Sequence, residues 1–307
     1  MRVSLALTGL SLALLPFTRG ARVLIGNDDG FGTANIRALY AAVRAAGHEA
    51  LIAAPVQQQS GTDGTMKDPT PLEREGEFGL VPKGAPAEGH DAADDHIWYI
   101  NSTPASSIKY GLDVLAPRYF GGPPDVVLTG PNQGSNLGLA YLVSGTYGAA
   151  KYAVAQGVPG IALSAQNATV RPYTELGGPE DQANIYAAQA VQLLGQLLKS
   201  SPPLPRGTGL NVNFPSAPQR GCTASNSRWI VSRLLGNVQR SPDACTCGDT
   251  SAASGCKLPV ERNVLDKKHG CSNSISGFAP TTWSPDTSAQ QQQVVIESLQ
   301  GFTSCLA

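Results

Sequence analysis

The chain has 307 residues, of which 41% are hydrophobic and 15% are charged, and its formal net charge is −1. This length is sufficient for one large hydrophobic core or for two modest domains. Because the 22 basic and 23 acidic side chains nearly balance, the composition does not favour a nucleic-acid polymer or an anionic membrane as a partner. The 34 glycines and 23 prolines indicate many loops, but not a disordered chain.

Residues 1–20 have the features of a cleaved secretory signal peptide. Arg2 precedes the apolar stretch 3–15, which is too short to span a bilayer. Thr18 and Gly20 are small residues at the −3 and −1 positions of a cleavage site. We therefore predict cleavage near Gly20 and a secreted, extracellular protein. A buried N-terminal helix is the alternative.

Two adjacent carboxylates end the first predicted strand. Residues 23–25 are all large and aliphatic, which predicts a buried strand, and Gly30 permits the turn that must follow. Asp28 and Asp29 therefore lie at the carboxyl end of a core strand, where open α/β sheets bind their ligands. Because like charges repel, this pair requires a cation or a set of donors to compensate it. A bound metal ion is the simplest form of compensation.

Strand and helix patterns alternate along the next part of the chain. Ile36, Leu39 and Val43 recur at helical spacing, and Gly47 is a suitable helix stop. Further strands are predicted at 49–54, 97–100, 125–129, 160–164 and 209–213. Three further helices are predicted, of which the first begins at 104, the second ends at 157 and the third spans 180–199. This alternation predicts an α/β fold with a doubly wound, mainly parallel sheet. The Pro-, Gly- and acid-rich segment 64–95 is predicted to be a long irregular excursion.

Polar loops follow several of these elements at the same edge of the predicted sheet. Ser60 lies in the loop after the second strand, and Asn132 follows a later strand within a glycine-rich segment, 130–138. Glycines at this density let the backbone approach a small ligand closely. Together with Asp28 and Asp29, these side chains offer only oxygen ligands, which select a hard cation such as Mg²⁺, Mn²⁺ or Ca²⁺ over zinc.

A second group of polar residues suits a phosphate. Ser144, Gly145 and Thr146 open a predicted helix, so this segment offers backbone N–H groups, hydroxyl groups and the positive end of the helix dipole. Asn136 lies in the glycine-rich segment just before it. The sequence therefore places an anion site next to a cation site.

Residues 216–307 differ in character from the rest of the chain. They contain short β-prone runs at 229–231 and 275–279, a predicted final helix at 287–300, and all six cysteines, which are Cys222, Cys245, Cys247, Cys256, Cys271 and Cys305. With a secretory signal this even number favours three disulfides, although six cysteines allow 15 pairings. A zinc site is the weaker alternative because no C-x₂-C pair is present. We predict a disulfide-rich extension of the same domain and a candidate oligomerisation arm.

Several ordered motifs resemble the SurE family (survival protein E), which comprises 5′/3′-nucleotidases and acid phosphatases. The resemblance covers about residues 22–215, so we define 21–215 as the catalytic core. The motifs that carry it are Asn27-Asp28-Asp29-Gly30, Gln59-Ser60-Gly61, the spaced Gly130, Asn132, Gly134, Asn136, Leu137 and Gly138, Ser144-Gly145-Thr146 with Gly148-Ala149-Ala150, and Leu210-Asn211-Val212-Asn213-Phe214-Pro215.

The resemblance implies a divalent-metal-dependent phosphomonoesterase with a Rossmann-like core, assembled as a homodimer or a larger homo-oligomer. The expected cation is Mg²⁺ or Mn²⁺, with Ca²⁺ as an alternative, and the expected substrates are nucleoside monophosphates or other small phosphate monoesters. Asp28 and Asp29 would also be the catalytic residues, one of them accepting the proton of the attacking water. The resemblance implies metal ligation by Asp28, Asp29, Ser60 and Asn132, and phosphate binding by Asn136, Ser144, Gly145 and Thr146.

Other functions have less support in the sequence. There is no G-x-S-x-G motif for a serine hydrolase and no G-x-G-x-x-G after the first strand for a dinucleotide. A phosphatase with an aspartyl nucleophile would require the Asp-x-Asp spacing, which the first strand lacks. The remaining rival is a secreted, non-catalytic ligand-binding protein with a SurE-like fold.

Overall fold

The computed structural model describes residues 20–235, 242–247, 256–280 and 286–306. All but the last residue of the predicted signal peptide therefore lies outside the described residues. Across the described part of the chain, every helix is too short or too polar to cross a membrane.

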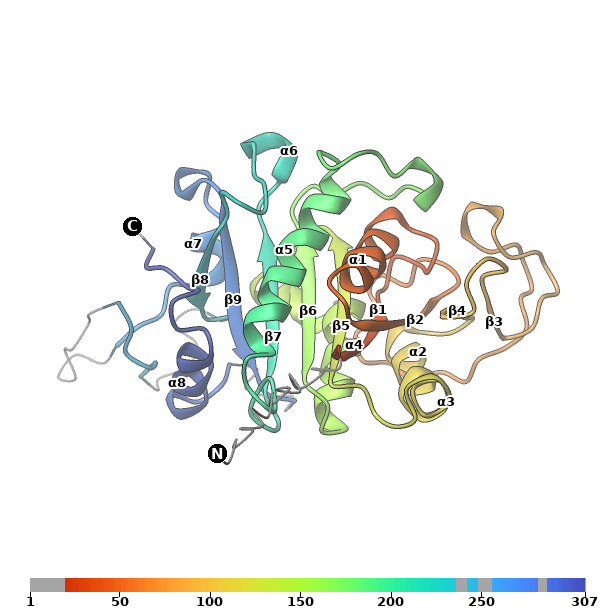
Figure 1. Ribbon diagram of the computed structural model, residues 1–307, viewed down its shortest axis with the longest axis horizontal. Coiled ribbons are helices and arrows are strands. Elements are labelled where there is room, and N and C mark those ends of the chain that lie inside the picture. Colours follow the sequence, from red (N-terminus) through yellow and green to blue (C-terminus); the bar gives the residue numbers. More distant parts are fainter. Residues whose placement is uncertain (1–19, 236–241, 248–255, 281–285, 307) are drawn as a thin grey trace, which may run out of the picture.

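One mixed sheet of nine strands forms the centre of the described structure (Figure 1). The strands follow the order β3-β4-β2-β1-β5-β6-β7-β9-β8, and all neighbours from β4 to β7 are parallel. β3 and β9 run antiparallel to β4 and β7. The strands are β1 (Arg22–Gly26), β2 (Glu49–Pro55), β3 (Glu88–His90), β4 (Ile97–Ile100), β5 (Val126–Gln133), β6 (Gly160–Ala165), β7 (Gly209–Phe214), β8 (Arg228–Ser232) and β9 (Ser272–Phe278).

Helices cover both faces of this sheet, which confirms the predicted doubly wound α/β fold. α1 packs beside α5 on one face, and α2 packs beside α4 on the other (Figure 1). The helices are α1 (Ala34–Ala45), α2 (Pro104–Tyr110), α3 (Ala116–Phe120), α4 (Gly145–Ala155), α5 (Gln182–Leu197), α6 (Ala217–Arg220), α7 (Glu261–Val264) and α8 (Ala289–Ser298).

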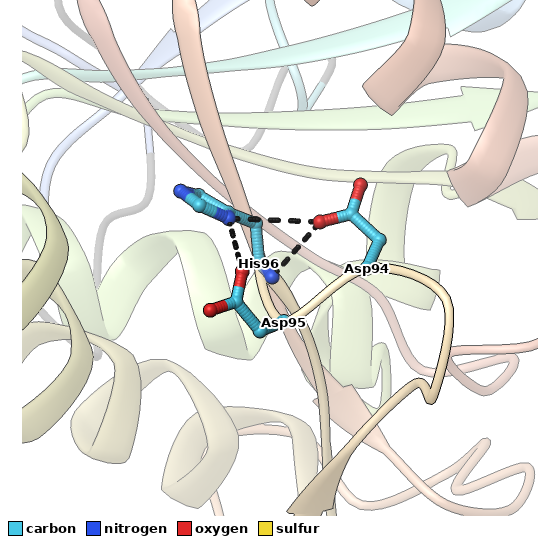
Figure 2. Close-up of side chains that lie close together, drawn as sticks. All are labelled: Asp94, Asp95 and His96. Atoms are coloured by element: carbon cyan, nitrogen blue, oxygen red, sulfur yellow. Dashed lines mark hydrogen bonds and ion pairs between the residues drawn. The ribbon is translucent and has the colours of Figure 1, made fainter.

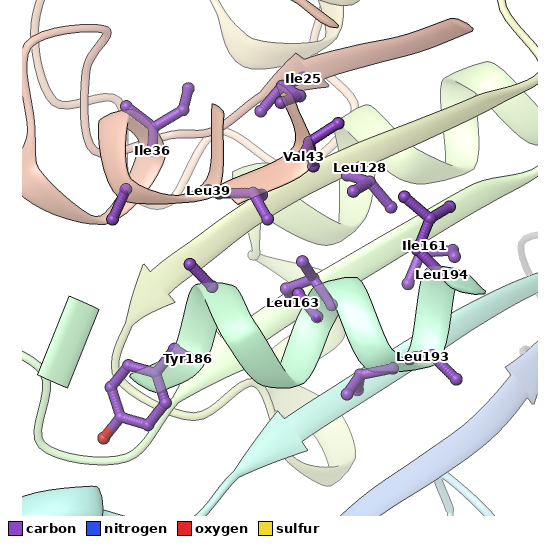
Figure 3. Close-up of a cluster of buried hydrophobic side chains, with 14 of the residues drawn as sticks. Ile25, Ile36, Leu39, Val43, Leu128, Ile161, Leu163, Tyr186, Leu193 and Leu194 are labelled. Atoms are coloured by element: carbon purple, nitrogen blue, oxygen red, sulfur yellow. The ribbon is translucent and has the colours of Figure 1, made fainter. Parts of the chain in front are cut away.

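The strand β1 is buried on both of its faces. Ile25 belongs to the cluster under α1 and α5, together with Leu39 and Leu193 (Figure 3). Leu24 belongs to the other cluster, which lies under α2 and α4. Alternate side chains of a strand point to opposite faces, so a continuous apolar run is required for a strand at the centre of a parallel sheet. This packing fixes the position of the acid pair that follows β1.

The segment 64–95 is largely irregular, as predicted, but it contains two short elements that the sequence pattern does not indicate. These are the 3₁₀ turn η1 (Glu77–Gly79) and the edge strand β3. The strand β3 pairs with β4, although the sequence Glu-Gly-His has no apolar alternation. Such a strand is stabilised by its backbone pairing rather than by side-chain burial.

The C-terminal extension continues the sheet of the core. β9 pairs with β7, and β8 pairs with β9, so the last two strands of the chain lie at one edge of the same sheet. All six cysteines lie within the described residues and form three disulfides, which favours the disulfide prediction over a zinc site. The pairs are Cys222–Cys271, Cys245–Cys256 and Cys247–Cys305.

The Cys222–Cys271 disulfide joins the end of α6 to the start of β9. Replacing both cysteines with serine is expected to lower the free energy of unfolding by about 2–5 kcal/mol, because the bridge restricts a long loop in the unfolded chain and Cys222 is buried. Urea denaturation followed by circular dichroism measures this loss. The double replacement at Cys247 and Cys305 is the comparison, because this disulfide closes a loop of similar length but both of its side chains are exposed; it should cost less, since no buried side chain is lost. A Cys222/Cys271 variant as stable as the wild type would contradict the prediction.

Candidate metal and phosphate site

The acid pair lies in a rigid, buried turn directly after β1. Asp28 is 3% exposed and Asp29 is 1% exposed. The Asn27 side chain holds the turn, because its Nδ2 donates to the Gly30 carbonyl at 2.9 Å and its Oδ1 accepts from the Gly30 N–H at 3.2 Å. Gly30 has a φ of +109°, which only glycine adopts readily. The two carboxylates are therefore held in place by the backbone around them.

Asp28 is in contact with the start of α4. The Thr146 hydroxyl donates to Asp28 Oδ1 at 2.6 Å. A Cβ atom at Gly145 would lie 2.9 Å from Asp28 Cβ, so the helix approaches this closely only because Gly145 lacks a side chain. Burial raises the pKa of Asp28, and the hydrogen bond from Thr146 opposes that increase.

Asp29 has one carboxylate oxygen without a partner. Its Oδ2 accepts from the Gln133 N–H at 3.0 Å, whereas its Oδ1 is buried and has no hydrogen bond. Burial raises the pKa of Asp29 well above its ordinary value, and the neighbouring charges of Asp28 and Glu77 add to the increase. Buried polar atoms normally have partners. A buried, unpartnered carboxylate oxygen in an oxygen-rich site fits a divalent cation.

The two residues expected to supply neutral oxygen ligands lie in segments whose backbone bonds to this pair. Asn132 is buried at the end of β5, one residue from the Gln133 N–H that binds Asp29. Its Nδ2 donates to the Gly134 carbonyl at 2.8 Å. This bond uses the amide nitrogen of Asn132 and not the amide oxygen, which is the atom that would bind a cation. Ser60 is exposed in a turn, and the N–H of its neighbour Gln59 donates to the Asp28 carbonyl at 2.7 Å.

The expected phosphate-binding residues form the N-terminus of α4, an eleven-residue helix. Ser144 is the N-cap, and its Oγ accepts from the Tyr147 N–H at 3.1 Å. Gly145 and Thr146 follow in the first turn, and all three residues are buried. The positive end of this helix is thus beside Asp28, in the position that suits an anion next to a cation.

Asn136 lies in the same region but is bound within the protein. Its Nδ2 donates to Ser164 Oγ at 2.8 Å, and its backbone N–H donates to Asn213 Oδ1 at 2.9 Å. Its carbonyl accepts from the Nδ2 atoms of Asn211 and Asn213. To donate to a phosphate, the Asn136 amide nitrogen would therefore have to break its hydrogen bond to Ser164.

Glu77 and Glu261 are near these residues but are absent from the sequence predictions. The Glu77 Oε2 atom lies 2.7 Å from the position that a Cβ of Gly30 would take. Glu261 Oε1 accepts from the Gly138 N–H at 2.8 Å. Both acids come from segments without a clear periodic pattern, so no local signal distinguishes them. By contrast, Asn211 and Asn213 interrupt an apolar strand, and buried amides of this kind indicate a structural role.

A second acidic cluster lies away from this site. In Figure 2, His96 Nδ1 lies 2.8 Å from Asp95 Oδ1 and 3.6 Å from Asp94 Oδ1. These residues precede β4, so they lie at the amino ends of the parallel strands, at the opposite edge from Asp28. Asp94 also accepts from the Tyr40 hydroxyl and pairs with Arg44. The cluster is therefore explained by contacts within its own turn and with α1.

The chain is similar to known proteins over most of its length. Residues 23–234 match the family model described as Survival protein SurE. The chain is 33% identical over 311 residues to an acid phosphatase of Yarrowia lipolytica, in an alignment that covers 91% of this chain and 85% of the relative. It is 34% identical over 197 residues to the 5′-nucleotidase SurE of a Cyanothece strain, covering 64% of this chain and 63% of the relative.

The fold is also similar to a solved structure. The crystal structure of a SurE protein from Aquifex aeolicus aligns with a TM-score of 0.57 at 21% sequence identity, covering 84% of this chain and 93% of that one. The family model spans more than half of the chain, including the acid pair, the glycine-rich segment and the start of α4. The chain belongs to the SurE family.

Proposed function

We propose that this protein is a divalent-metal-dependent phosphomonoesterase that hydrolyses nucleoside monophosphates or other small phosphate monoesters. The observation that carries the proposal is the buried, unpartnered Oδ1 atom of Asp29, beside Asp28 and the N-terminus of α4. A cation site next to an anion site is the arrangement that phosphoryl hydrolysis requires. The relatives described as acid phosphatase and 5′-nucleotidase support the same reaction class.

Asp28, Asp29, Ser60 and Asn132 would hold the cation, for which Mg²⁺ or Mn²⁺ is the best candidate and Ca²⁺ the alternative. When bound, such an ion neutralises charge on the phosphoryl group and lowers the pKa of a water molecule. One of the two aspartates would accept the proton of the attacking water. The carboxylates thus serve both in binding and in proton transfer.

The start of α4 would bind the phosphoryl group of the substrate. The backbone N–H groups of Gly145 and Thr146 lie in the first turn of the helix, where they have no partner within the helix. Ser144 and Asn136 complete the phosphate site in this proposal. Fixed donors of this kind stabilise negative charge on phosphoryl oxygens without reorganising during the reaction.

We also propose that the protein is secreted and forms a homodimer or larger homo-oligomer. Three disulfides favour an oxidising compartment. They agree with the signal peptide predicted at residues 1–20.

Phosphate release tests the proposed function. The purified protein is expected to release phosphate from p-nitrophenyl phosphate and 5′-AMP when Mg²⁺ or Mn²⁺ is present, and to lose this activity in EDTA. Restoring the cation should restore the rate. Activity that EDTA does not change would contradict the metal-dependent reaction. Binding of 5′-AMP without phosphate release at any pH would indicate the non-catalytic binding protein instead.

A further inference from the structure

Glu77 is placed by a constrained turn beside the acid pair. The turn η1 is fixed at both ends, because the Glu77 N–H donates to the Val56 carbonyl at 3.2 Å and the Gly76 N–H donates to the Val81 carbonyl at 2.8 Å. Phe78, the next residue, has a φ of +58° although it is not glycine. Backbone conformations of this kind are costly and persist where the surrounding structure holds them.

The Glu77 carboxylate points toward the turn that carries Asp28 and Asp29. Its Oε2 atom is buried without a hydrogen-bond partner and lies against Gly30, the residue after Asp29. The backbone N–H of Gln58 donates to the same carboxylate. Burial is the main cause of the raised pKa of Asp29, and the negative charges of Asp28 and Glu77 add to it.

Two buried carboxylate oxygens on either side of Gly30 therefore have no hydrogen-bond partner: Oδ1 of Asp29, the residue before Gly30, and Oε2 of Glu77, which lies against Gly30. Asp29 itself is 1% exposed. Among the ion pairs formed by the described residues, none involves Asp28, Asp29 or Glu77. Carboxylates that lie close together in a buried site without a basic partner destabilise the fold, unless a bound cation compensates their charge.

We propose that Glu77 is a third acidic member of the cation site, a positioning residue whose charge strengthens the binding of the divalent ion by Asp28 and Asp29. This inference rests on the proposed function, because it concerns the same ion. It goes beyond the ligands that the sequence motifs imply, since Glu77 comes from the irregular segment 64–95. The charge of Glu77 stabilises the protein when the cation is bound and destabilises it when the cation is absent.

The substitution Glu77→Gln tests both halves of this statement. Glutamine keeps the size of the side chain and an oxygen for the Gln58 N–H, but it removes the charge. Isothermal titration of the metal-free protein with Mn²⁺ should show a Kd about tenfold higher than in the wild type. The unfolding temperature of the metal-free protein should rise by about 2 °C, because the repulsion is relieved. A structural role alone would lower that temperature.

The substitution Glu75→Gln is the matched control. Glu75 belongs to the same acidic segment and is exposed, and its Oε1 atom lies 3.6 Å from the position that a Cβ of Gly79 would take. Its replacement should change neither the Kd for Mn²⁺ nor the unfolding temperature. An equal effect in both variants would attribute the result to the net charge of the protein and would overturn the proposal.

Other outcomes separate this inference from the proposed function. If Mn²⁺ binds the wild type but not the Asp29→Asn variant, and Glu77→Gln binds it as tightly as the wild type, the role of Glu77 is refuted and the metal site stands. If the Glu77→Gln variant loses both affinity and metal-free stability, Glu77 is a structural residue. If the wild type binds no Mn²⁺, the metal site of the proposed function fails together with this inference.

Discussion

Replacing Asp29 with asparagine is expected to lower kcat/KM for 5′-AMP by about a thousandfold, and replacing Asp28 is expected to have a similar effect. Both carboxylates are almost completely buried, so no mobile surface group substitutes for them. Asparagine removes the charge that holds the cation and the group that accepts the proton of water. Steady-state kinetics at saturating Mn²⁺ measure the loss.

The fold of both variants should be retained. Asparagine is nearly the same size as aspartate and relieves the repulsion between the two charges, so the unfolding temperature of the metal-free protein should not fall. Asp113→Asn is the control, because Asp113 is exposed and pairs with Lys109 on the surface; it should leave kcat/KM unchanged. Full activity in both Asp28→Asn and Asp29→Asn would exclude the acid pair as the catalytic centre.

Replacing Glu261 with alanine is expected to lower the free energy of unfolding by about 3 kcal/mol. Glu261 is fully buried, and its carboxylate accepts hydrogen bonds from the Gly138 N–H, Asn211 Nδ2 and Ser276 Oγ. Alanine leaves these three donors without their acceptor. Urea denaturation of the metal-free protein measures the effect. The Glu261→Gln variant keeps the volume of the side chain and one carbonyl oxygen, so its free energy of unfolding should fall by less.

The same substitution should also affect the reaction. Asn211 donates both to Glu261 and to the Asn136 carbonyl, so Glu261 connects α7 to the loop that carries Asn136. A looser loop positions the phosphate less well, and kcat/KM for 5′-AMP is expected to fall about tenfold in the alanine variant. Unchanged stability and kinetics in Glu261→Ala would show that the loop is held by other contacts.

Glu261 further predicts how stability depends on pH. Burial raises its pKa to about 8 from 4.5, and the hydrogen bonds from Gly138, Asn211 and Ser276 oppose that increase. Between these two pKa values the folded protein holds a proton that the unfolded chain releases, so stability decreases as the pH rises through this range. Unfolding temperatures of the metal-free protein from pH 5 to pH 8 should show this decrease. The Glu261→Gln variant should show a smaller slope, and an equal slope in both proteins would assign it to other groups.

The sequence by itself determined the features that depend on local pattern. The apolar run before Asp28 predicts a buried strand that ends in two carboxylates, and the alternation of strands and helices predicts the doubly wound sheet. Ser144 was predictable as part of a helix start because capping depends on neighbouring residues only. These properties follow from hydrophobic periodicity and from short-range hydrogen bonds, which a linear sequence displays directly.

The tertiary structure alone decided the contacts between distant segments. These contacts include the cysteine pairs, the pairing of β9 with β7, the approach of Glu77 to Gly30 and the hydrogen bond between Glu261 and Gly138. Each of them joins residues that are far apart in the chain. It also showed that Ser60 is exposed and that the Asn136 amide binds Ser164. Such contacts depend on how helices and strands pack against one another. A single acidic residue in an irregular loop therefore carries no sign of them until the chain has folded.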